Sequence, residues 1–168
     1  MALETYKDFT VKVRVTYPEE VERKLMALKA EFMGEYEQTD HYFSATKGKL
    51  KWRKGNIENV IMHYERVSEG GVERTVVYRY DVNPTESDID ALKQHHQALG
   101  AVKKKRRIFY LSHVKIHLDE FCGEHFLEIE AIDEHNVFSY DQLKVHCRAI
   151  QQQLGFSDQD VIPTGYLK

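Results

Sequence analysis

The sequence has few of the residues that hold small extracellular proteins together. Its two cysteines, Cys122 and Cys147, are too few and too far apart for a disulfide framework or a zinc knuckle. It has three prolines and no low-complexity run, so no linker divides it. No apolar run is long enough for a signal peptide or a bilayer span. These absences predict a soluble, cytoplasmic protein with a single domain over residues 1–168.

The chain also has little net charge. Its 27 acidic residues oppose 24 basic ones, which leaves a net charge of −3. Such a balance gives no overall attraction to nucleic acid or to a membrane surface, so neither is expected as a partner. The 42% of apolar residues is enough for a sizeable core. We expect a monomer or a homodimer.

Charged side chains are abundant, however, and they follow a strict pattern between residues 102 and 133. Three strands are predicted there, because charged and apolar residues alternate with a period of two. In a single strand this alternation is typical of one solvated face. The charged positions of the three strands are Lys104 and Arg106, then Lys115, His117 and Asp119, then Glu128 and Glu130.

The same alternation recurs elsewhere. Lys12 and Arg14 alternate with valines in a predicted strand over residues 9–15. Lys51 and Arg53 do so in a strand over residues 50–53. Further strands are predicted at 41–44, 59–66 and 74–82, the last two forming a hairpin around Glu69-Gly70-Gly71. About eight strands joined mostly by hairpins predict an antiparallel sheet, which can close on itself and so remove its exposed edges.

Three amphipathic helices are predicted between these strands. The first begins at Pro18, and a loop follows Gly34; the second is capped by Thr85 and ended by Gly100; the third begins after Ser139. A turn is expected at residues 163–166. The predicted inward-facing residues are Val21, Leu25, Leu28 and Phe32 in the first helix, Ile89, Leu92 and His96 or Leu99 in the second, and Leu143, Cys147, Ile150 and Leu154 in the third.

Strands and helices together predict an α+β fold. It would be an eight-stranded antiparallel closed barrel with about three helices covering its apolar outer face. The charged positions would then line the inside. Unpaired charges in a dry interior cost several kcal/mol each, so the interior is expected to be wet and suited to a highly charged ligand.

Six sequence motifs stand out along the chain. They are KVRV at 12–15, QTDHYF at 38–43, LKWR at 50–53, VKKKRR at 102–107, VKIHLDEF at 114–121 and FLEIE at 126–130. Together they resemble the CYTH superfamily, which includes class IV adenylyl cyclases, thiamine triphosphatases and inorganic triphosphatases. The resemblance covers nearly the whole chain, and it implies a triphosphate tunnel whose bases hold the phosphates and whose carboxylates hold a divalent metal.

Carried over position by position, the resemblance implies a set of site residues and Mg²⁺ or Mn²⁺ as cofactor. Among them Lys12, Arg53, Glu128 and Glu130 are the expected catalytic residues. The expected phosphate-binding residues are Lys12, Arg14, Lys51, Arg53, Lys104 and Arg106, and the expected metal ligands are Asp8, Asp119, Glu128 and Glu130.

The sequence also departs from the family pattern. Asp8 and Thr10 stand where the family has two metal-binding glutamates, and Glu65 stands where a lysine is usual. Inside the tunnel, Glu65 would repel a triphosphate. The basic residue usual in the fifth strand corresponds to either Arg74 or Arg79. By strand parity His63 and His117 are further candidates for the lining, as general bases or phosphate ligands.

The resemblance implies metal-dependent hydrolysis of a triphosphate, such as thiamine triphosphate, tripolyphosphate or a nucleoside triphosphate. Adenylyl cyclase activity is less favoured, because no part of the sequence suggests an adenine pocket. The alternative is a diverged protein whose incomplete first metal site binds a different small ligand or performs different chemistry. A third possibility is a domain that uses the fold as a scaffold for partner contacts.

Overall fold

The structure is a computed structural model that describes residues 4–69 and 72–162. Its contacts divide the chain into two compact units. The first contains Tyr36–Lys103 and the N-terminal residues 4–5; the second contains Tyr6–Glu35 and residues 104–162. The strands β2 (Glu31–Phe43) and β6 (Ala98–Leu111) run through both units. The predicted single domain over residues 1–168 stays a prediction.

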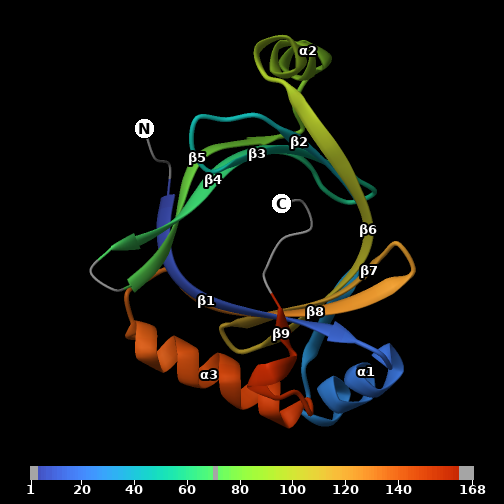
Figure 1. Ribbon diagram of the computed structural model, residues 1–168, viewed down its shortest axis with the longest axis vertical. Coiled ribbons are helices and arrows are strands. Elements are labelled where there is room, and N and C mark those ends of the chain that lie inside the picture. The colour runs from blue at the N-terminus through green and yellow to red at the C-terminus, as the bar shows by residue number, and fades with distance from the viewer. Residues whose placement is uncertain (1–3, 70–71, 163–168) are drawn as a thin grey trace. The chain divides into compact units, whose positions relative to one another are not determined.

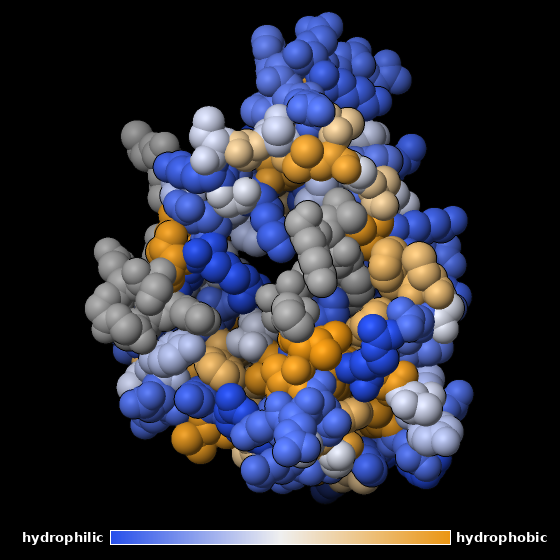
Figure 2. All heavy atoms as spheres, in the orientation of Figure 1, coloured by the Kyte–Doolittle hydropathy of each residue, from blue (hydrophilic) through white to orange (hydrophobic). Residues whose placement is uncertain are grey.

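The first unit is an antiparallel sheet covered by one helix. Its strands follow the order β5-β4-β3-β2, where β3 is Lys49–Gly55, β4 is Asn59–Glu69 and β5 is Val72–Val82. The helix α2, Glu86–His95, begins with the predicted cap: the Thr85 side chain accepts from the Asp88 N–H, and the Asp88 carboxylate accepts from the Thr85 N–H. Figure 2 shows that the outer surface of α2 is hydrophilic.

The inner side of α2 packs on one face of this sheet. Ile89 and Leu92 of the helix are buried against Phe43, Leu50 and Ile61, which lie on three different strands. This face is the apolar one that alternation predicted for the strand over residues 50–53. The first unit therefore has one face covered by α2 and a second, opposite face.

The second unit has the same plan with two covering helices. Its strands follow the order β6-β7-β8-β1-β9, where β7 is Val114–Phe121, β8 is Glu124–Asp133, β1 is Glu4–Val15 and β9 is Val161–Ile162. Helix α1 is Pro18–Ala27, helix α3 is Tyr140–Gln153, and a short 3-10 helix spans Asp158–Asp160. Figure 1 shows α1 and α3 on the same side of β1 and β8.

These two helices bury the apolar face of the β1–β8–β7 part of the sheet. Val21 and Leu25 of α1 lie in this core, as do the four predicted inward-facing residues of α3. The strands contribute valine, leucine and isoleucine side chains from every second position. The sheet residues of this core are Val11, Val13, Val15, Phe109, Val114, Ile116, Leu118, Leu127, Ile129 and Ala131.

The predicted fold class is confirmed. The long strands follow the order β5-β4-β3-β2-β6-β7-β8-β1, and the strand pairs of known register are antiparallel. β5 also pairs with β1, whose first residues belong to the same unit as β5. Each of the eight long strands therefore pairs with two other long strands, and three α-helices accompany them. Within the described residues, no helix combines the length and apolarity that a membrane span requires.

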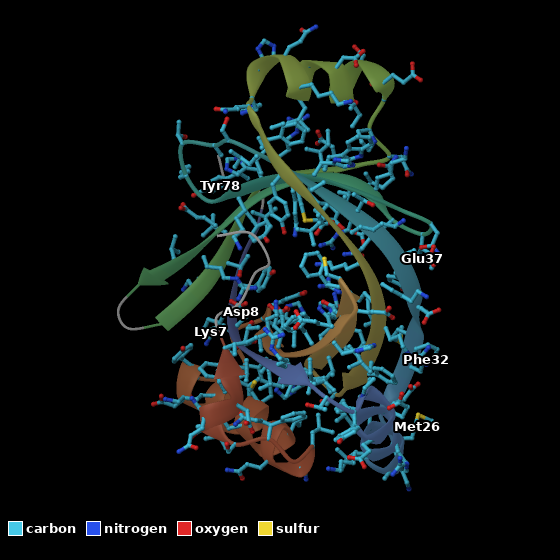
Figure 3. The ribbon with its side chains drawn as sticks, turned by 45° about the vertical axis from the view of Figure 1, so that its right-hand side comes forward. Lys7, Asp8, Met26, Phe32, Glu37 and Tyr78 are labelled. Atoms are coloured by element: carbon cyan, nitrogen blue, oxygen red, sulfur yellow. The ribbon has the colours of Figure 1, made fainter. Side chains whose placement is uncertain are left out.

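Two predicted helix ends are wrong. The first helix ends at Ala27, because Lys29 takes a left-handed conformation with φ 63°. Phe32 therefore lies on β2 and is 44% exposed. Figure 3 shows it near Met26 of α1. The predicted loop after Gly34 is instead part of β2.

The second helix ends at His95, and the next residue is already extended. The candidate inward residue Leu99 lies on β6 and is 60% exposed, and Gly100 lies within the same strand. Arg107 is an exception to the alternation of charged and apolar side chains on β6. It lies on the face covered by the helices and pairs with Glu22 and Glu35. The predicted hairpin is present, since Glu69 pairs with Val72, but residues 70–71 lie outside the described residues. The predicted turn at 163–166 does so too.

Candidate functional site

The strand register places most of the predicted site residues on one face of the second unit. Lys12 lies opposite Glu128, and Thr10 lies opposite Glu130. Residues directly opposite each other in an antiparallel pair project to the same face. We call this face, which lies opposite the α1 and α3 side, the charged face. Its residues are Asp8, Thr10, Lys12, Arg14, Lys104, Arg106, Lys115, His117, Asp119, Phe126, Glu128 and Glu130.

Several charges of this face are buried. Lys12 is 2% exposed and Asp119 is 1% exposed, and Lys104 and Arg106 are also buried. Buried charges are tolerated when an opposite charge or hydrogen bonds compensate them. For Lys12 the residue across β8 is Glu128, and the Nζ atom lies 4.8 Å from the centre of the Phe126 ring. The face therefore concentrates positive and negative groups away from bulk water.

Arg106 and Asp119 form the best-defined ion pair of the charged face. They lie opposite each other on β6 and β7. Nε of Arg106 donates to Oδ1 of Asp119 at 2.8 Å, and Nη2 donates to Oδ2 at 2.9 Å. Both oxygens of the predicted metal ligand Asp119 thus accept hydrogen bonds from a predicted phosphate-binding residue.

Glu128 and Glu130 are the carboxylates best suited to a metal ion. They are two residues apart on β8, so both project from the same face, and both are half-buried. Glu128 lies between Lys12 and His117 on the neighbouring strands, and Glu130 lies between Thr10 and Lys115. Mg²⁺ is usually held by one or two carboxylates, with water and substrate phosphates as further ligands.

The geometry limits how many protein ligands such an ion would have. Over the described part of the chain, no three histidine, cysteine or acidic side chains are grouped closely enough to hold one metal ion. Glu128 and Glu130 therefore fit an ion that shares a substrate phosphate, but not an ion held by the protein alone.

Asp8 lies at one end of the charged face. It is buried on β1 and lies opposite Ile132, whereas Thr10 lies opposite Glu130. Its neighbour Lys7, labelled beside Asp8 in Figure 3, is on the helix-covered face. Nζ of Lys7 lies 3.4 Å from Oδ2 of Asp133. Asp8 thus precedes Thr10 by two residues on the same face of β1. The position directly opposite Glu130 is occupied by the hydroxyl-bearing Thr10, not by Asp8.

The first unit places Lys51 and Arg53 on its open face, the one that α2 does not cover, together with an acid that the sequence analysis did not single out. Asp40 lies opposite Arg53 on β2 and is 0% exposed. Its Oδ1 accepts from Nε of Arg53 at 2.8 Å, and Oδ2 accepts from Nη2 at 3.0 Å. Nζ of Lys51 is 3.4 Å from Oδ2. A signal existed, since Asp40 is part of the QTDHYF motif.

Two tyrosine rings surround Lys51. Its Nζ lies 5.5 Å from the ring centre of Tyr42 and 5.4 Å from that of Tyr64. Burial raises the pKa of Tyr64, so this phenol stays neutral at physiological pH. Aromatic faces attract a cation, and they therefore help to hold the ammonium group in place.

Glu65 is not on the face that carries Lys51 and Arg53, which removes the expected repulsion of a triphosphate. Lys49 pairs with Tyr64, so Tyr64 shares the open face and Glu65, the next residue, projects to the side covered by α2. There Glu65 accepts a hydrogen bond from the hydroxyl of Tyr78. His63 lies on the same side, opposite Leu50.

Neither candidate arginine of β5 lies on the open face of the first unit. Arg79 pairs with His63, and Arg74 pairs with Val67, two residues after Glu65. Both positions belong to the side that α2 covers. The sequence could not reveal this, because β5 contains a bulge at Tyr78 that changes its alternation.

A family model for the CYTH domain matches residues 9–166. The chain belongs to the CYTH family. This match agrees with the fold and with the position of the motif residues on the two sheet faces. No curated protein sequence matches the chain.

Several solved structures resemble the chain over most of its length. A protein from Pyrococcus horikoshii is 29% identical with a TM-score of 0.80, over 95% of this chain and 96% of that one. A proposed adenylate cyclase from Vibrio parahaemolyticus is 18% identical with a TM-score of 0.76, over 95% of both chains. A proposed adenylyl cyclase from Hippeastrum, described as having a dominant triphosphatase activity, is 14% identical with a TM-score of 0.59, over 89% of this chain and 88% of that one.

Proposed function

We propose that this CYTH protein hydrolyses a small triphosphate with the help of Mg²⁺ or Mn²⁺. One observation carries the proposal: the charged face of the second unit combines buried bases with two adjacent carboxylates. Bases alone would bind an anion, and carboxylates alone would bind a cation. Their combination suits the complex of a polyphosphate with a divalent metal, whose two parts have opposite charge.

Four bases of the charged face would neutralise the phosphates. In phosphoryl transfer the protein mainly positions the reactants and stabilises the charge on the phosphoryl oxygens. Lys12 supplies a compact ammonium donor beside Glu128, and Arg106 supplies a planar guanidinium. The proposed phosphate-binding residues of this face are Lys12, Arg14, Lys104 and Arg106. For the first unit taken by itself, Lys51 and Arg53 are proposed to bind an anionic group.

Glu128 and Glu130 would hold the metal ion. A bound divalent ion neutralises phosphoryl oxygens and lowers the pKa of coordinated water. The two glutamates would hold the ion on the same face as Lys12, and Lys115 lies opposite Glu130 on the next strand. Thr10 offers a hydroxyl where a further carboxylate would strengthen metal binding, so we expect weak metal affinity before the substrate binds.

The test is phosphate release from tripolyphosphate, thiamine triphosphate and ATP, measured with Mg²⁺ and with Mn²⁺. We expect turnover of at least one of them, and Glu128→Gln or Glu130→Gln should raise the metal concentration for half-maximal activity about 10–100-fold. Glu65→Gln is the matched control, since Glu65 projects to the other side of its sheet. The proposal is overturned if a folded protein, checked by circular dichroism, hydrolyses none of the three.

A second candidate function is binding without hydrolysis. The position of Thr10 opposite Glu130 favours it, because a site with fewer carboxylates can retain an anion and yet lack the metal that activates water. Calorimetry with tripolyphosphate separates the two functions. Binding with no phosphate release supports the second candidate.

A further inference from the structure

Each unit contains an arginine that is held in the same way by a buried aspartate. In both pairs the two residues lie directly opposite each other on antiparallel strands, Asp40 with Arg53 and Arg106 with Asp119. In both pairs Nε donates to Oδ1 and Nη2 donates to Oδ2, at 2.8–3.0 Å. The two aspartates are among the least exposed residues of the protein. The repetition in two separate units indicates a common purpose.

This side-on pairing fixes the plane of the guanidinium group. An arginine has five N–H donors in a rigid arrangement, and the pairing uses one on Nε and one on Nη2. Nη1 takes no part in the pairing with aspartate, and in the first unit Nη1 of Arg53 lies 3.9 Å from Oε1 of Glu58. A phosphate that approaches the Nη1 side would meet donors whose orientation is already set, so the cost of ordering the side chain is paid when the protein folds.

The same pairing makes Asp119 a poor metal ligand. A buried carboxylate that accepts two hydrogen bonds from a guanidinium would have to break at least one of them to bind an ion. Its strand position also separates it from the glutamates, because Asp119 lies opposite Phe126 rather than opposite Glu128. No corresponding arginine lies opposite Glu128 or Glu130, whose neighbours are Lys12, His117, Thr10 and Lys115.

We propose that Asp119 and Asp40 are positioning residues, each of which orients the arginine of its own unit, Arg106 or Arg53, toward an anionic group, and that Asp119 does not bind the metal. The catalytic consequence rests on the proposed triphosphatase function, whereas the orientation of the two arginines does not. Each aspartate partly neutralises its arginine, which weakens the attraction for an anion, but it also fixes the orientation of the N–H donors. Loss of the aspartate should therefore lower kcat, which depends on donor orientation, more than it changes KM.

The first experiment measures kcat, KM and the Mg²⁺ requirement of Asp119→Asn. We expect kcat to fall about 10–100-fold because the arginine loses its orientation, with the Mg²⁺ concentration for half-maximal activity unchanged. Glu128→Gln is the reference for loss of a metal ligand. Asp81→Asn is the matched control, because Asp81 pairs with Nε of Arg79 on the α2 side of the first unit. A shift in Mg²⁺ requirement for Asp119→Asn as large as that of Glu128→Gln would overturn the proposal.

The second experiment needs no turnover and no variant. Nitrogen-15 NMR of the arginine Nε–H groups in the unliganded protein reports how fast each group exchanges its hydrogen with water. We expect slow exchange for Arg106 and Arg53, and fast exchange for Arg79, whose pair is partly exposed. If Arg106 and Arg53 exchange as fast as Arg79, the inference fails. If they exchange slowly while no triphosphate is hydrolysed, only the proposed function fails.

Discussion

The two units of the protein carry related but unequal faces. Both present an arginine held by a buried aspartate, Arg53 with Asp40 in the first unit and Arg106 with Asp119 in the second. Beside this pair the first unit has Lys51 between two tyrosine rings. The second unit instead has Glu128 and Glu130, two carboxylates on one strand.

The difference separates the groups proposed to bind anions from those proposed to bind a metal ion. Both units have an arginine–aspartate pair and a lysine, which are the groups proposed for phosphate. The two carboxylates proposed for a divalent ion lie in the second unit, on a strand face that also carries buried bases. The comparison predicts that substitutions in the two units change different measurable quantities.

The largest effect is expected from breaking the buried ion pairs. Arg106→Ala leaves the buried charge of Asp119 without its guanidinium partner, which typically costs about 3–5 kcal/mol of folding free energy. Arg53→Ala should lie near the lower end of this range, because Lys51 still contacts Asp40. Urea denaturation at neutral pH measures both changes.

Arg79→Ala is the control for this prediction. Its pair with Asp81 is partly exposed to solvent, so the loss should be below about 1 kcal/mol. The double substitution Arg106→Met with Asp119→Leu should recover most of the lost stability, because no uncompensated charge remains. An Arg106→Ala variant as stable as Arg79→Ala would show that water already reaches Asp119.

Asp133 in the second unit is a buried aspartate that is stabilised by backbone groups instead of arginine. Burial alone would raise its pKa, but the N–H groups of Val137, Phe138 and His135, together with Lys7, lower the pKa to about 2. A lowered pKa means that Asp133 stabilises the fold fully above about pH 4, and that this contribution is lost as the pH falls towards 2.

Asp133→Asn should therefore cost about 1–3 kcal/mol at pH 7, from weaker hydrogen bonds in the loop. The difference from the wild type should shrink between pH 4 and pH 2, which urea denaturation at several pH values measures. Because Asp133 lies on the helix-covered face beside Lys7, turnover at pH 7 should stay within about twofold of the wild type. A pH-independent difference would contradict the assignment of the low pKa.

Thr10 and Glu65 give a smaller contrast between the two units. Thr10→Glu adds a carboxylate opposite Glu130 and should lower the Mg²⁺ requirement about tenfold. Glu65→Lys should leave it unchanged, because Glu65 points to the α2 side of the first unit. Metal titrations of phosphate release test both variants. If Glu65→Lys alone improved activity, the assigned strand register of β4 would be wrong.

The sequence predicted the charged face of the second unit because its strands alternate without interruption. The two-residue alternation of side chains was enough to place Lys12 and Arg14 of β1 on the same face as Glu128 and Glu130 of β8. The match to the CYTH domain and the structural relatives then confirmed the fold.

Alternation was insufficient where the backbone departs from regular geometry. Because of the bulge at Tyr78, the alternation pattern did not show which face of the sheet carries Arg79. The left-handed conformation of Lys29 ends the first helix, although the helical spacing of apolar residues continues to Phe32. Pairing was a second limit. The partnership of Asp40 with Arg53 depends on the register between β2 and β3, which local patterns do not specify without the length of the connecting turn.

The smallest predicted effect compares the helix that covers each sheet. Thr85 caps α2 in the first unit and Ser139 caps α3 in the second, and removing such a cap costs about 1 kcal/mol. Helix α2 buries only Ile89 and Leu92, whereas α3 buries four residues in the larger core. Removing the cap of α2 should therefore destabilise only that helix, whereas removing the cap of α3 should lower the free energy of unfolding of the whole unit.

Hydrogen exchange and urea denaturation together distinguish these outcomes. Thr85→Ala should reduce the protection of the α2 amides while the global free energy of unfolding changes little. Ser139→Ala should lower that free energy by about 1 kcal/mol, and exchange should increase throughout the second unit. Thr85→Ser and Ser139→Thr retain a capping hydroxyl and serve as controls. Equal global effects of the two alanine variants would mean that α2 unfolds only together with its sheet, and that the two units are more alike in stability than their cores indicate.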